Sequence, residues 1–316
     1  MKADVGFLSS DAMKGRLTGS IFQDIAAEYI ASRFSEIGLK TKGDKNTYMQ
    51  TFYFSPAADP HSTSPTLATG QDSLKIINVA GYIDNNAAQT LIIGAHYDHL
   101  GDGHSGFSLS TEGGIHNGAD DNASGVAALL EVASRVVARN DNRRTIVFAA
   151  FGAEEMGLIG SKQFTAEPPV DLSKTTAMVN FDMVGRLDTV TQALSIGGTQ
   201  TSLQSEEILN RLNPGFKLAF SGEGIGPSDH APFYLLNIPV FFEKENINTG
   251  SMESELFLSI LSGVAEGEST SISENNKWGI KKRFENGTYK LGYVPYGYRW
   301  ENGEIIVDPE QAVIVK

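Results

Sequence analysis

The chain of 316 residues contains no cysteine. Disulfide bonds and thiolate metal sites are therefore excluded, and any transition metal has to be held by His, Asp and Glu side chains. Histidine is scarce as well, with six residues in the whole chain. They are His61, His96, His99, His104, His116 and His230.

Basic residues are also few. The chain has 25 Lys and Arg against 38 Asp and Glu, a formal net charge of −13 and an isoelectric point near 4.9. Binding to nucleic acid phosphates needs clustered Lys and Arg, so this balance argues against a nucleic-acid surface over the whole molecule. A local basic patch stays open.

Long apolar runs are absent too. No run approaches the roughly 18 residues of a membrane helix, and the first 20 residues lack the apolar core of a signal peptide. We therefore expect no membrane association. The chain as written predicts a cytoplasmic protein, unless its natural start is missing.

Apolar residues make up 41% of the chain, enough for one large α/β domain or two smaller ones. Apolar residues at helical spacing predict helices, and β-rich apolar runs predict strands. The expected helices cover 20–38, 124–139, 202–213 and 230–237. The expected strands cover 75–83, 89–98, 193–198 and 238–242, the first two being neighbours across a polar turn, and 144–155 and 175–185 each hold a buried strand that runs into a loop. This alternation predicts a three-layer α/β/α fold with a mixed, mostly parallel sheet.

Acidic residues and one His follow the predicted strands. His96 and Asp98 close one strand, Glu154 and Glu155 follow another, and Asp182 follows a third. Ligands of open α/β sheets bind outside the carboxyl ends of the strands. Like charges gathered there repel unless a cation lies among them, and His with carboxylates suits zinc.

Each residue alone has a simpler interpretation. A lone His at a strand end is usually a satisfied polar residue, and Glu154 and Glu155 could be solvated. Asp121 or Asn122, just before a helical segment, could be a helix N-cap. The metal hypothesis therefore depends on the residues taken together.

Five segments in order resemble one peptidase family. They are GAHYDHLG (94–101), NGADDNASG (117–125), FAAFGAEEMG (148–157), NFDMVGR (180–186) and SDHAPF (228–233). The family is that of the co-catalytic zinc peptidases, which includes bacterial leucyl aminopeptidases, glutamate carboxypeptidase and glutaminyl cyclase. LSSDAMKGRLTGS (8–20) resembles the start of that domain in bacterial members. The resemblance implies the zinc exopeptidase fold, and relatives are often exported.

The resemblance also implies two zinc ions and their ligands. His96 and Asp182 match the ligands of one ion, and Glu155 matches a ligand of the other. Asp121 matches the aspartate that bridges both ions.

Two further roles follow from the same resemblance. Asp98 matches the carboxylate that orients the ring of His96, and Glu154 matches the general base acting on the metal-bridging water. Asp229 and His230 lie in a segment that is near the substrate pocket in the family.

One expected ligand is missing. In the family the last zinc ligand is a His after the next strand, in a segment resembling Tyr-His-x-x-x-Asp-Thr, but no His follows His230. We therefore expect a peptidase domain over 1–242 that lacks its C-terminal end. It would be a zinc exopeptidase, most simply an aminopeptidase acting on peptides. Carboxypeptidase and cyclase chemistry, or an impaired remnant, stay open, as does the oligomeric state.

Residues 243–316 resemble the middle of a large serine recombinase, in which a long helix leads into a DNA-binding domain. The resemblance implies a long helix over 251–286, a small irregular α+β tail, and DNA contact by Lys281, Lys282 and Arg283. The alternative is a solvated amphipathic helix, because the segment holds eight Lys and Arg against twelve Asp and Glu. The domain prediction is thus a peptidase part joined to a recombinase-like fragment.

Overall fold

The computed structural model divides the chain into two compact units, residues 1–275 and 276–316. The described residues are 1–55, 73–103, 113–139, 144–186, 193–213, 215–222, 224–244, 298–301 and 304–307. In the second unit they form an antiparallel hairpin of β10 (Tyr298–Glu301) and β11 (Glu304–Val307). The first unit contains the remaining elements.

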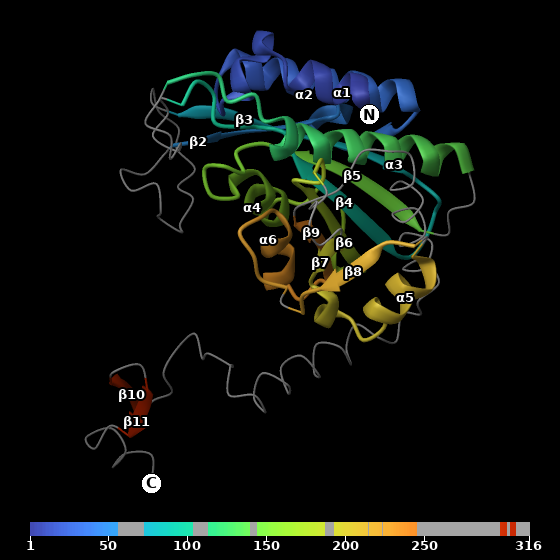
Figure 1. The fold of residues 1–316 in the computed structure, drawn as a ribbon, viewed down its shortest axis with the longest axis vertical. Coiled ribbons are helices and arrows are strands. Elements are labelled where there is room, and N and C mark those ends of the chain that lie inside the picture. Colours follow the sequence, from blue (N-terminus) through green and yellow to red (C-terminus); the bar gives the residue numbers. More distant parts are fainter. Residues whose placement is uncertain are drawn as a thin grey trace. The chain divides into compact units, whose positions relative to one another are not determined.

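Helices and strands alternate along the first unit (Figure 1). Its α-helices are α1 (Lys2–Leu8), α2 (Ile21–Ile37), α3 (Gly125–Arg139), α4 (Ile159–Ala166), α5 (Ser205–Leu212) and α6 (His230–Leu235). Its strands are β1 (Lys40–Thr41), β2 (Met49–Phe54), β3 (Leu74–Ile83), β4 (Thr90–His96), β5 (Thr145–Phe151), β6 (Thr175–Asp182), β7 (Ala193–Gly197), β8 (Lys217–Phe220) and β9 (Val240–Lys244).

These strands form one mixed sheet in the order β1-β3-β5-β4-β6-β9-β7-β8, with β2 also paired to β3. The central strands β5, β4, β6 and β9 run parallel to one another. The antiparallel pairs lie toward the two sides, where β3 meets β5 and β7 meets β9. The parallel centre brings the carboxyl ends of four strands to one edge of the sheet.

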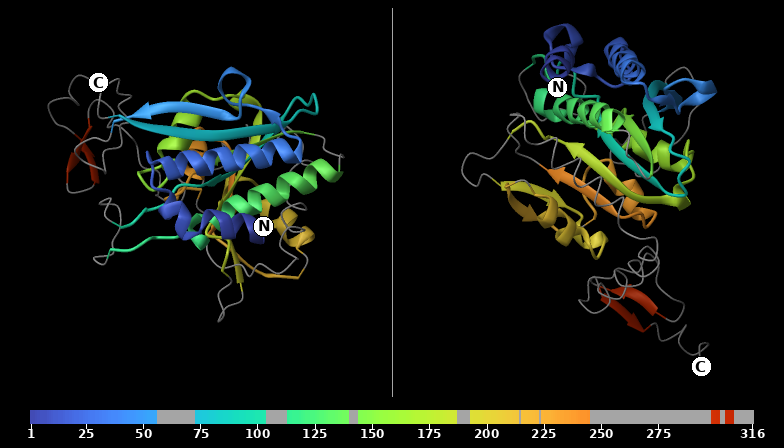
Figure 2. Two further views of the ribbon diagram at one scale, coloured as in Figure 1. Left: turned by 90° about the horizontal axis from the view of Figure 1, so that it is seen from above. Right: turned by 90° about the vertical axis from the view of Figure 1, so that its right-hand side faces the viewer.

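Side chains of the central strands alternate between two cores. On one face, Leu91, Ile93 and Ala95 of β4 pack in a cluster with α2 and α3. On the other face, Ile92 packs with Phe164 of α4 and Phe233 of α6. Figure 2 shows the helices on both sides of the sheet. The predicted three-layer α/β/α fold is therefore confirmed.

Local sequence sets the ends of α2. The Ser20 hydroxyl oxygen accepts a hydrogen bond from the backbone N–H of Gln23, and Gly38 ends the helix in the left-handed conformation. The helix predicted over 20–38 begins and ends at these two residues.

One expected pairing was wrong. β3 and β4 are consecutive in the chain but are not neighbours, because β5 lies between them and pairs with both. Local apolar patterns identify buried strands but carry no information about which strand inserts between two others. α1, α4, β1, β2 and β8 were not predicted.

Several predictions fall outside the described residues. They are the helix over 251–286 and the DNA contacts of Lys281, Lys282 and Arg283. The boundary between 242 and 243 stays a prediction. No helix in the described part of the chain combines the length and apolar character needed to cross a membrane.

Candidate metal centre

The predicted acidic and His residues come together where the parallel strands end. His96 is the last residue of β4, Asp182 is the last of β6, and Glu154 and Glu155 follow β5. Asp121 lies in a short helical turn (Ala119–Ser124) before α3. The sheet order explains this meeting, because β5, β4 and β6 are adjacent and parallel.

A first group of potential metal ligands surrounds His96. Its Nε2 lies 3.2 Å from Oδ1 of Asp182 and 3.2 Å from Oδ1 of Asp121. Oε2 of Glu154 lies 4.0 Å from the same nitrogen. The ligand atoms of His96, Glu154 and Asp182 all lie within 4.8 Å of one another.

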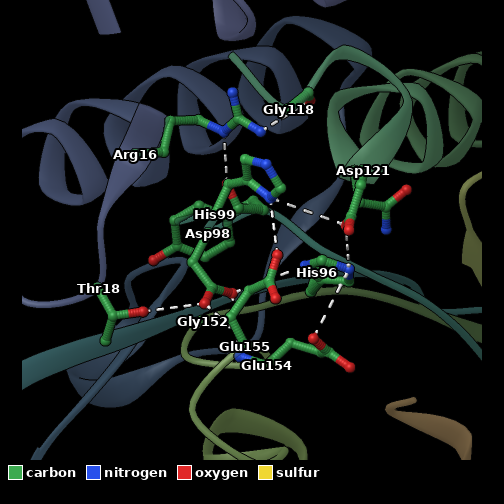
Figure 3. A network of polar contacts seen from close by, with 12 residues as sticks. Arg16, Thr18, His96, Asp98, His99, Gly118, Asp121, Gly152, Glu154 and Glu155 are labelled. Atoms are coloured by element: carbon green, nitrogen blue, oxygen red, sulfur yellow. Dashed lines mark hydrogen bonds and ion pairs between the residues drawn. The ribbon is translucent and has the colours of Figure 1, made fainter. Parts of the chain in front are cut away.

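A second group contains a residue that the sequence analysis did not assign (Figure 3). Nδ1 of His99 lies 2.7 Å from Oε1 of Glu155 and 4.0 Å from Oδ1 of Asp121. The ligand atoms of His99, Asp121 and Glu155 lie within 4.8 Å of one another. The only sequence signal was a second imidazole three residues after His96, which the matched motif left without a role.

Neighbouring residues have different roles in the pairs Asp121–Asn122 and Glu154–Glu155. Oδ1 of Asn122, not Asp121, accepts a hydrogen bond from the backbone N–H of Gly125 at the start of α3. The capping alternative thus applies to Asn122 and leaves the Asp121 carboxylate facing both histidines. Glu154 faces the first group and Glu155 the second. Ala153, just before them, has a φ of +59°, a left-handed conformation that is uncommon for a residue with a side chain.

Asp98 stabilises the arrangement of His96, Glu154 and Glu155 through hydrogen bonds and an ion pair. It is fully buried, and its carboxylate accepts hydrogen bonds from the Thr18 hydroxyl at 2.9 Å and from the Glu154 backbone N–H at 3.0 Å. The Glu155 backbone N–H donates to the same Asp98 carboxylate at 3.4 Å. Nδ1 of His96 lies 3.8 Å from this carboxylate, an ion-pair distance. Asp98 therefore connects β4, the Glu154–Glu155 loop and the N-terminal segment.

Arg16 is a buried cation close to the carboxylates of the two ligand groups. Its guanidinium donates to the carbonyl oxygens of Tyr97 at 2.8 Å, Asn117 at 2.8 Å and Gly118 at 3.0 Å. Burial lowers the pKa of Arg16 to about 10, while Asp98, Asp121 and Glu155 oppose this effect. The side chain stays charged at neutral pH and joins the two loops that carry His99 and Asp121.

Charges within the first group shift the pKa values of its members. Burial alone would lower the pKa of His96, but Glu154, Asp182 and Asp121 raise it well above its usual value. Burial raises the pKa of Glu154 well above its usual value, although His96 opposes this. A cation bound to His96 must therefore displace a proton.

Asp229 and His230 are both fully buried. Burial raises the pKa of Asp229 to about 7 and lowers that of His230 to about 4. The His230 ring stacks on Phe242 with centroids 3.6 Å apart, and neither ring nitrogen has a hydrogen-bond partner. His230 is thus a neutral, packed imidazole, and its place in a substrate pocket stays a prediction.

The donor set fits zinc. Every candidate ligand atom is an imidazole nitrogen or a carboxylate oxygen. Oδ1 of Asp121 is buried and has no hydrogen-bond partner, although it faces both histidines. A buried carboxylate oxygen without a partner is costly, and a cation between the two groups would satisfy it.

Comparison with known proteins gives one family. Residues 78–252 match the model of peptidase family M28. Leupeptin-inactivating enzyme 1 of Streptomyces exfoliatus is 30% identical over 164 residues, 51% of this chain and 34% of that protein. Aminopeptidase YwaD of Bacillus subtilis is 29% identical over 191 residues, 59% of this chain and 38% of that protein. The chain thus spans little more than a third of the length of these relatives.

Among solved structures, a Zn-dependent exopeptidase from Parabacteroides distasonis has the same fold. The TM-score is 0.61 at 17% identity, and the match covers 84% of this chain and 96% of that one. At this identity the likeness supports the architecture alone.

Proposed function

Because this chain belongs to peptidase family M28, we propose that it is a zinc-dependent exopeptidase, and most simply an aminopeptidase acting on N-terminal peptide bonds. The observation that carries the proposal is the pair of imidazole–carboxylate groups on either side of Asp121 Oδ1. They lie at the carboxyl edge of a parallel sheet, where ligands of such folds bind.

In this proposal His96 and Asp182 would hold one zinc ion, Glu155 would hold the other, and Asp121 would serve both. The distances of 3.2 Å from His96 Nε2 to both Asp121 and Asp182 support the first set. When bound, the metal supplies a Lewis acid and a water of lowered pKa. The number of ions is part of the proposal.

Glu154 is the proposed general base. Its backbone is fixed by the hydrogen bond to Asp98, and its carboxylate lies 4.0 Å from His96 Nε2 at the side of the first group. Burial raises the pKa of Glu154, which makes its carboxylate a better proton acceptor. Its side chain is 11% exposed, so the base is shielded but open to a substrate.

The names of the relatives favour aminopeptidase activity, since one is called an aminopeptidase and the other inactivates leupeptin. Carboxypeptidase and glutaminyl cyclase chemistry are the alternatives. A panel of substrates separates them: an aminoacyl anilide, an N-blocked peptide with a free carboxyl end, and an N-terminal glutaminyl peptide. We expect turnover of the anilide only.

Replacement of Glu154 by Gln tests the mechanism. We expect anilide turnover to fall by about 10²- to 10⁴-fold, the usual contribution of a general base, with zinc content unchanged. Glu131→Gln on α3, away from the site, is the matched control. Full activity in Glu154→Gln would contradict the proposed role. Weak or single-site zinc binding without turnover in the wild type would favour the impaired-remnant alternative.

Nucleic acid binding by residues 243–316 stays a separate hypothesis. It depends on the recombinase-like pattern and on Lys281, Lys282 and Arg283, which lie outside the described residues. Salt-dependent binding of duplex DNA by the full chain, weakened by replacing these three residues with Ala, would support it.

A further inference from the structure

The second proposed zinc position lacks one ligand if only the motif residues are counted. Glu155 and the shared Asp121 are present, but no His follows His230 in the sequence. A zinc site in a protein normally has at least three protein ligands. A third donor near Glu155 would complete this site.

We propose that His99 is that donor, so that Nδ1 of His99 completes the second zinc site together with Glu155 and Asp121. This inference rests on the proposed two-zinc function. Nδ1 lies 2.7 Å from Glu155 and 4.0 Å from Asp121 Oδ1. The family resemblance assigns both Glu155 and Asp121 to this ion.

The two halves of the site then have the same composition. On one side His96 faces Asp182, and on the other His99 faces Glu155. Oδ1 of Asp121 lies between the two imidazoles and has no hydrogen-bond partner. Each ion would have one imidazole, one carboxylate of its own and the shared Asp121.

The ring of His99 is held in place before any metal binds. Its backbone N–H donates to the carbonyl of Arg16 at 3.2 Å, and its side chain is only 9% exposed. Gly118 packs so closely that a Cβ there would lie 2.6 Å from Cδ2 of His99. A ligand fixed by its surroundings loses little entropy on binding.

The other described histidines are less suited. The ring of His116 packs edge-on against His99 with centroids 6.3 Å apart, and His116 is in neither ligand group. His230 is stacked on Phe242. His61 and His104 lie outside the described residues.

His99 could instead serve only to orient Glu155 by a hydrogen bond. His99→Gln separates the two roles, because the amide keeps a hydrogen-bond donor but is a poor zinc ligand. His116→Gln is the matched control. Zinc binding to full-length metal-free protein would be measured by competition with a chelating dye, with circular dichroism as a check of folding.

We expect the wild type and His116→Gln to bind two zinc ions. His99→Gln should keep the first site and bind the second ion at least 10- to 100-fold more weakly, because losing a ligand should cost no less than losing the partner that orients one. X-ray absorption of the wild type with two zinc ions should show about one imidazole per ion.

Three results would overturn the proposal. Two sites of unchanged affinity in His99→Gln, or loss of the second site in His116→Gln instead, would remove His99 while leaving the zinc peptidase function in place. An X-ray absorption spectrum with imidazole on only half of the ions would do the same. A wild type that binds no zinc would overturn both this inference and the proposed function.

Discussion

At the scale of single residues, Asp98 is a buried carboxylate that faces hydrogen-bond donors from two directions. Thr18 and the backbone of Glu154 both donate to it, and His96 lies at ion-pair distance. Burial would raise the pKa of Asp98, but His96 and these hydrogen bonds lower it overall. Asp98 therefore stays ionised and can hold the orientation of His96.

Asp98→Asn should weaken zinc binding about 10- to 100-fold, the usual effect of removing a partner that orients a metal ligand. The amide can keep the bond from Thr18 but loses the charge opposite His96. Competition with a chelating dye measures the change. Asp24→Asn, at an exposed ion pair with Lys75, is the control and should bind zinc normally. Equal affinities in the two variants would contradict the role of Asp98.

His230 makes stability depend on pH. Its pKa in the folded protein is about 4, below the ordinary value of 6.5, so the unfolded chain binds more protons between these two values. The free energy of unfolding should therefore fall as the pH falls from about 6.5 to about 4, by a few kcal/mol at most.

His230→Leu should flatten this part of the pH profile, because the substituted side chain does not titrate. Urea denaturation of metal-free protein at several pH values gives the comparison. As the pH falls below 6.5, the free energy of unfolding of the wild type should fall relative to that of the variant. Parallel profiles would show that His230 does not titrate with folding.

At the scale of elements, Arg16 links the segment after α1 to the loop after β4 and to the loop before α3. Arg16→Lys should lower the free energy of unfolding by roughly 2–4 kcal/mol, because one ammonium cannot replace all of the bonds to buried carbonyls. Urea denaturation measures this. Arg135→Lys, in a partly exposed pair with Glu131 on α3, should change stability by less than about 1 kcal/mol. Equal losses of unfolding free energy in Arg16→Lys and Arg135→Lys would contradict the linking role of Arg16.

Many of the helices and strands could be predicted from the sequence. The ends of α2 follow from Ser20 and Gly38, and the strands that carry His96, Glu154 and Asp182 follow from their apolar runs. The sequence also predicted that these residues meet at one edge of the sheet, which the structure confirms.

What could not be predicted depends on contacts between distant segments. The position of β5 between β3 and β4 is set by pairing across the sheet, not by any local pattern. His99 lies beside Glu155, 56 residues further along the chain, and the hydrogen bond between them has no counterpart in the sequence. Arg16 is buried close to the site although arginine is usually exposed.

At the scale of the whole molecule, the chain has a net charge of −13 and concentrates carboxylates at one edge of the sheet. Removing zinc should leave the repulsion between these carboxylates uncompensated. We expect EDTA treatment to lower the Tm, and zinc to restore it with a Tm that rises with free zinc concentration. Magnesium at the same concentration is the control. A Tm that does not respond to zinc would contradict a zinc site in the folded protein.

The support that Arg16 and Thr18 give to the site has a consequence for how short the protein can be made. Residues 78–252 match the family model and contain His96, His99 and all the acidic residues of the two groups. Yet Arg16 and Thr18 come from outside this region, as do α1, α2 and β2. A polypeptide trimmed to the matched region would possess every proposed metal ligand and still lack the side chains that hold their loops in position.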